Sequence, residues 1–476
     1  MRLIRLIVAA ASLLVGCGVP KEAGFSTVAA AVEQRTGHRI FWNQGGAADT
    51  AVASKVREML AGDLTRAQTV QIALLNNRSL QATYEELTIA QADVVQAGLL
   101  KNPVFSGRVR FPTSGVTHAP NFELGIDQDF LDLLLIPARR RLASAAFEAA
   151  KLRVGQQVLD VAHDVRAAYY LMQGAQQIAA MRRAILDASD ASAELARRQH
   201  DAGNISDLDL ANEESLYEQV RIDLMRSEAD ILGGRERLNR LMGLWGQDTS
   251  WTIAPKLPEL PGDEPSLEHL ESIAIGQRLD VGAARHDLQA SSYALAMATN
   301  WRWLGGLSVG ADLERDPEGK TVAGPAVSLE LPIFDQKQAV VARLVARYRQ
   351  SRLRLSALSV EARSEVREAR GRLLVARAVA DRYRIRVIPL RESLVALSQQ
   401  HYDAMLLGVY QLLLAKQNEV NAYREYIEAV RDYWIARSNL ERAVGGRLPA
   451  SSGLGPSPPS PAAPAAFAPL PQHTHP

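Results

Sequence analysis

Two short stretches with alternating apolar and polar side chains recur about 200 residues later, so the chain contains an internal duplication that constrains its fold. Residues 104–111 and 122–128 place apolar side chains at every second position, which is the period of a β-strand. The breakers at 112–115 predict a loop between them. We therefore expect a β-hairpin at about 104–130.

The second copy of this pattern lies at residues 307–314 and 327–331, and it predicts a hairpin at about 306–332. The chain thus contains four short strands in a sequence that is otherwise helical in period. The apolar faces are formed by Phe105, Val109, Phe111, Phe122, Leu124, Ile126, Leu307, Val309, Leu313, Val327, Leu329 and Leu331.

Long helices fill the rest of the first half. A helical pattern runs from Thr65 to the stop at 102–103, and residues 138–202 contain no proline. About 65 helical residues would span roughly 95 Å, far more than a globular helix needs. A break at 203–206 precedes a helix at 207–242 that carries a heptad seam.

The second half repeats this order of elements. We expect helices at 266–300 and 336–404, a turn at 405–408 and a last helix that ends at Val444. Pro389 falls inside the long helix and is expected to kink it. The two structural repeats are therefore 65–245 and 266–445, joined by a linker at 246–265 that is rich in proline and glycine.

The N-terminus resembles a secretory signal peptide over residues 1–16. Residues 14–17 resemble a lipobox, and Cys17 is the only cysteine, so we expect a covalent lipid on Cys17 and an outer-membrane anchor. Residues 17–64 show no sustained period and are expected to form an extension that lies along the body. The tail, 446–476, is rich in proline and alanine and is predicted to be disordered.

Composition excludes several function classes. The 54 basic and 53 acidic residues leave a net charge of +1, which gives no support to nucleic-acid binding. No nucleotide-binding, hydrolase or zinc-protease motif occurs, so we expect neither an enzyme nor a cofactor. His473 and His475 stand on the flexible tail and would bind a metal only weakly, so no metal site is predicted.

The strand count forces assembly with other copies. The alternation suits a barrel wall in lipid, but the smallest membrane barrels need eight strands and an open sheet cannot sit in hydrocarbon. Three copies would supply twelve strands, and long antiparallel helices would continue them as a tube. The polar side chains then face the lumen: Arg108, Arg110, Glu123, Asp127, Asp312, Glu314 and Glu330.

The duplicated halves, the hairpin in each and the turn segments at 201–209 and 402–409 resemble the TolC family of outer-membrane efflux proteins, including its lipidated members. The resemblance covers about residues 65–445. It implies a mainly α fold with a small β part: a homotrimer with a 12-stranded transmembrane β-barrel and a long α-helical barrel that crosses the periplasm. It also implies two partners, a periplasmic adaptor and an inner-membrane pump, here expected to be of the RND type.

The same resemblance assigns roles at the two turns. The adaptor-docking tips correspond to Gly203, Asn204, Leu406, Leu407 and Gly408. Asp207 and Asp209 could line a cation-attracting aperture, although Asp207 could instead cap its helix. By the repeat, Asp209 corresponds to Gln411, which weakens an acidic ring.

The sequence therefore predicts a passive trimeric exit duct in the outer membrane, which accepts cargo from an inner-membrane pump through an adaptor. The alternative is a lipid-anchored periplasmic coiled-coil scaffold without a pore. Outward apolar side chains on the hairpins favour the duct, because a scaffold has no use for them. Cargo stays open among drugs, metal ions and secreted protein.

Overall fold

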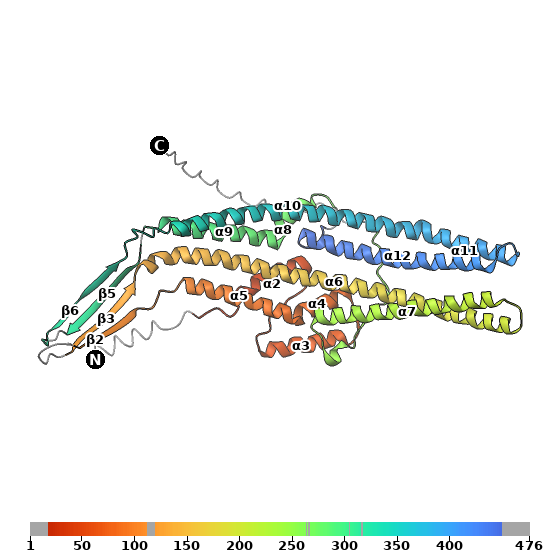
Figure 1. Cartoon of the computed structure of the whole chain (residues 1–476), viewed down its shortest axis with the longest axis horizontal. Coiled ribbons are helices and arrows are strands. Elements are labelled where there is room, and N and C mark those ends of the chain that lie inside the picture. The colour runs from red at the N-terminus through yellow and green to blue at the C-terminus, as the bar shows by residue number, and fades with distance from the viewer. Residues whose placement is uncertain are drawn as a thin grey trace, which may run out of the picture.

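The protein is an elongated rod with a β-sheet at one end and two helical hairpins at the other (Figure 1). The computed structural model describes residues 18–111, 120–262, 264, 267–303, 305–315 and 318–449. The expected signal peptide, Cys17, the breakers at 112–115 and the tail from 450 onward lie outside these residues. In the described parts of the chain, none of the helices combines the length and apolar character needed to cross a membrane.

The two predicted hairpins are confirmed and join into one antiparallel sheet in the order β2-β3-β5-β6. One expected boundary was wrong, because β6 begins at Thr321, six residues before the predicted start at 327. Its early part contains Pro325, which an edge strand tolerates because one row of its backbone groups is unpaired. The strands are β2 (Val104–Arg110), β3 (Asn121–Asp129), β5 (Leu307–Arg315) and β6 (Thr321–Leu329).

The long helices follow the prediction closely. The 71-residue helix α6 spans about 105 Å at 1.5 Å per residue. It begins before Pro137, which is its seventh residue and has no N–H to donate to the carbonyl of Leu133. Pro389 does disrupt the second long helix, through a π-helical turn that ends two residues before it. The helices are α6 (Leu131–Asp201), α7 (Asp207–Met242), α10 (Gln338–Arg382), the π turn (Tyr383–Val387), α11 (Ile388–Asp403) and α12 (Val409–Val444).

The helix that leads into each hairpin is broken, so the prediction of one continuous helix was wrong in both halves. Asn77 is extended (φ −62°, ψ 118°) between α4 (Arg66–Asn76) and α5 (Arg78–Ala97). Arg278 is extended in the same way (φ −63°, ψ 125°) between α8 (Leu270–Gln277) and α9 (Leu279–Asn300). The matching breaks strengthen the case for duplication.

The N-terminal extension is helical, which corrects the expectation of a segment without periodic structure. It contains α2 (Phe25–Thr36) and α3 (Ala47–Leu60) and lies along the body as expected (Figure 1). Phe25 packs edge-on against Tyr84 of α5, with 5.1 Å between ring centroids. Burial of these rings fastens the extension to the helical layer.

The core lies around the middle of the rod, where the extension and the linker meet the long helices. Strand β1 (Asp63–Leu64) pairs in parallel with β4 (Thr252–Ile253) of the linker, after a 3-10 turn at Gly246–Thr249. Trp251 is fully buried there, and its indole N–H donates to Asn239 at 2.8 Å. The expected linker is therefore part of the core.

Candidate functional site

The strand register gathers the predicted lumen residues on one face of the sheet. Arg108 is paired with Glu123, and Glu123 with Glu314, so these three side chains form a row across three strands. Arg108 and Arg110 each donate to Glu123 at 2.9 Å. Asn121 donates to Glu314 at 2.7 Å, and the same register puts Asp127 and Asp312 on this face. Glu330, just beyond β6, accepts from the Gly306 N–H at 3.0 Å.

The opposite face of the sheet is apolar and open. Phe105 is 71% exposed, Val327 69% and Leu124 43%, although each would be buried in an ordinary sheet core. Strands of 7 to 9 residues span roughly 23–30 Å, which matches an apolar band of about 25 Å in a membrane barrel. This sheet is therefore suited to stand between lipid and water.

The two turns at the far end of the rod share one geometry. Gly203 (φ 73°) and Met405 (φ 57°) are both left-handed, and the next residue donates its N–H across the helix end, Asn204 to Gln199 and Leu406 to His401, each at 2.8 Å. This pattern is the Schellman cap. The sequence placed Met405 in the turn but did not predict its left-handed backbone; the residue is 94% exposed and strained where the first half has glycine.

The predicted aperture residues make local contacts. Ser206 caps α7 in a capping box with Asp209, whose backbone N–H donates to the Ser206 hydroxyl at 3.2 Å. Asp207 lies 2.7 Å from the imidazole Nε2 of His200 rather than at the cap position. Gln411 lies in the first turn of α12 and donates its N–H to the Gly408 carbonyl at 3.2 Å. Within one protomer, both carboxylates thus already have partners.

Each helical hairpin near the tip is held by its own contacts. Arg183 pairs with Glu228 at 2.7 Å and Arg197 with Glu214 at 2.9 Å between α6 and α7. Between α11 and α12, Tyr423 donates to Glu392, and this hydrogen bond raises the pKa of the Tyr423 hydroxyl to about 12. Among the described residues, no hydrogen bond or ion pair links the two hairpins beyond Gly174, so they can separate at small cost.

Replacing Met405 with glycine should stabilise the second turn by about 1 kcal/mol, because glycine adopts a positive φ without strain. Hydrogen exchange of the amides at 400–408 should slow in the M405G variant. The variant M405A is the control, since it removes the side chain and keeps the strain. Equal protection in both variants would show that the side chain, not the backbone, sets the stability of the turn.

The geometry defines a class of protein: a subunit with a long helical wall that ends in an unclosed sheet, apolar on one face and charged on the other. Residues 69–244, which make up most of the first structural repeat, match the family model described as outer membrane efflux protein. Over these residues the chain is therefore similar to outer membrane efflux proteins.

Solved structures share this fold. They include a membrane protein from Pseudomonas aeruginosa, at 21% identity and a TM-score of 0.69 over 80% of this chain and 92% of that one. The CmeC outer membrane channel of Campylobacter jejuni has 17% sequence identity and a TM-score of 0.67, over 82% of this chain and 87% of that one. The outer membrane protein VceC of Vibrio cholerae has 16% sequence identity and a TM-score of 0.67, over 80% of this chain and 96% of that one. No curated protein matches the chain by sequence.

Proposed function

We propose that three copies of this chain form a passive exit duct of a tripartite efflux pump in the outer membrane. The observation that carries this proposal is the four-stranded sheet, which is apolar on one face, charged on the other and open at both edges. Three sheets joined edge to edge would make a closed barrel of twelve strands. Strand β6 would then pair with β2 of the next copy. Pro325 of β6 has no backbone N–H and would donate no hydrogen bond in this pairing.

The helical body would continue this barrel across the periplasm to the tips. There a periplasmic adaptor would contact the exposed turns at 203–204 and 405–408, and an inner-membrane pump of the RND type would supply the cargo. Because each hairpin is held mainly by its own bonds, opening would separate α11–α12 from α6–α7 without unfolding either. The subunit would perform no chemistry.

Planar-bilayer recording tests the duct. Purified protein should be a trimer by native mass spectrometry and should conduct in single steps, either alone or after addition of its adaptor. A stable monomer that never conducts with the adaptor present would instead support the lipid-anchored scaffold.

Lipidation of Cys17 is a separate part of the proposal. Wild-type protein from cells fed a labelled fatty acid should carry the label, and the C17A variant should lose it, because no other cysteine is present. Trimers of C17A should still reach the membrane, since one acyl site contributes far less than a closed barrel. Label retained by C17A would contradict a lipid at this position.

A further inference from the structure

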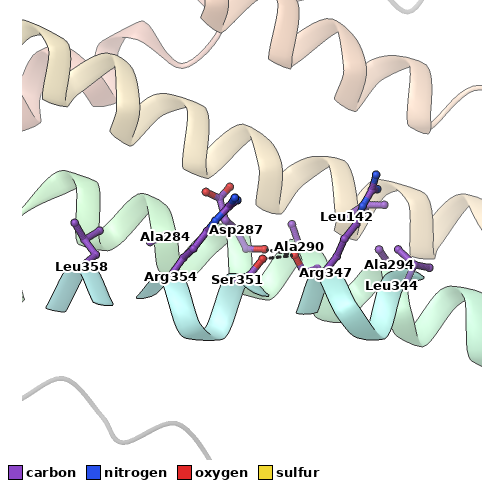
Figure 2. Close-up of a pocket in the computed structure, with 11 residues that line it drawn as sticks. Leu142, Ala284, Asp287, Ala290, Ala294, Leu344, Arg347, Ser351, Arg354 and Leu358 are labelled. Carbon is purple, nitrogen blue, oxygen red and sulfur yellow. Dashed lines mark hydrogen bonds between the residues drawn. The ribbon is translucent and has the colours of Figure 1, made fainter. Parts of the chain in front are cut away.

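A groove of about 620 Å³ lies where α6, α9 and α10 meet, between the sheet and the middle of the rod (Figure 2). Small side chains of α9 and α10 line part of the groove, where Ser291 and Ser351 hydrogen-bond at 3.0 Å. Leucine side chains also line it: Leu142, Leu344 and Leu358. The volume falls in the range of small-molecule sites. Nothing in the duct mechanism accounts for it.

Two guanidinium groups give the groove its charge. Arg347 and Arg354 extend from α10 across α9 toward α6 (Figure 2), and among the described residues no carboxylate lies within ion-pair distance of either. The single carboxylate that lines the groove belongs to Asp287, and Arg153 of α6 donates to both of its oxygens. The groove therefore has an excess of two positive charges.

The groove lies on the side of α6 that faces away from the start of α2. Gly24, the N-cap of α2, lies against Phe147 and Lys151 of α6, whereas Arg153 lies about 200° around the helix from Lys151. Asp129, at the end of the charged face, pairs with Lys101 at 3.0 Å, and Lys101 also pairs with Asp132 of α6 at 3.4 Å. Charged groups thus lead from that face onto α6.

We propose that this groove is a binding station for amphiphilic organic anions on their way through the duct. The two free guanidiniums would hold a sulfonate, carboxylate or phosphate, and the leucine walls would cover an apolar body. The proposal rests on the proposed duct and narrows its cargo: three copies would place six such arginines around one lumen, where basic rings favour anions.

A binding experiment on the full chain tests the station. The protein is placed in nanodiscs of phosphatidylcholine and titrated with 2-naphthalenesulfonate by calorimetry, with empty nanodiscs as the blank. The double variant R347Q/R354Q should bind this probe about tenfold more weakly than wild type, because both anion contacts are lost. The cation 2-naphthylmethylammonium, which carries the same ring, should bind neither protein.

The matched control is R349Q/R352Q, which removes the same charge from the same helix at positions that do not line the groove. It should bind the sulfonate within twofold of wild type, and native mass spectrometry should give one oligomeric state for all three proteins. Equal binding by R347Q/R354Q, equal weakening in the control, or equal affinity for the cation would each overturn the site. Anion binding without conductance would contradict the duct and leave the binding site standing.

Discussion

Replacing Leu124 with arginine should abolish assembly of the protein in the outer membrane. Leu124 lies in the middle of β3 on the apolar face, paired with Gly107 and Leu313. An arginine facing lipid near the bilayer centre costs about 2–4 kcal/mol, and a trimer would carry this cost three times. We expect the L124R trimer to be absent from outer-membrane fractions examined by native electrophoresis.

The matched control is D312R, one register step away on the charged face. Gly125 and Gly324 flank Asp312 on the neighbouring strands, so a longer side chain has room there. Although D312R changes the charge by two units, its arginine would face water and the trimer should form in normal amounts. If L124R assembled as well as D312R, the apolar face would not be in contact with lipid, and the scaffold would become the better interpretation.

The secondary structure could be predicted where each face of an element lies in one kind of environment, because the side chains then repeat with the period of that element. The strands alternate because lipid or water faces each side chain in turn, and this alternation located both hairpins. The breaks at Asn77 and Arg278 were not predictable, because neither residue interrupts the local helical pattern. Tertiary contacts decide them: the side chain of Asn77 caps Leu80 at 3.0 Å and also donates to the carbonyl of Leu241 at 2.7 Å.

The candidate site divides in the same way. Residues of the charged face follow from the strand period once the hairpins are known. In contrast, Arg347 and Arg354 look like the solvated side of a helix, and only the packing of α6 and α9 beside them makes a groove. The strain at Met405 also escapes the sequence, because a positive φ at methionine is set by the turn that closes around it.

Replacing Gly243 with alanine should destabilise the middle of the rod. Gly243 ends α7 at φ 68°, and a Cβ there would lie 2.6 Å from the carbonyl oxygen of Asn76. The left-handed conformation costs alanine about 1–2 kcal/mol, and relief of the clash would strain the break between α4 and α5. We expect a total loss of about 2–4 kcal/mol, seen as a lower melting temperature by circular dichroism.

The variant G203A separates the two causes, because Gly203 has φ 73° but open space around its Cβ position. It should lose only this conformational cost of about 1–2 kcal/mol, and the loss should be confined to the tip. In the second half, a Cβ at Gly445 (φ 87°) would lie 3.0 Å from the backbone of Arg278, so G445A should behave like G243A. Equal melting of G203A and G243A would mean that contact between each return helix and its break contributes nothing. The two halves would then share their order of elements, but this contact would not stabilise either of them.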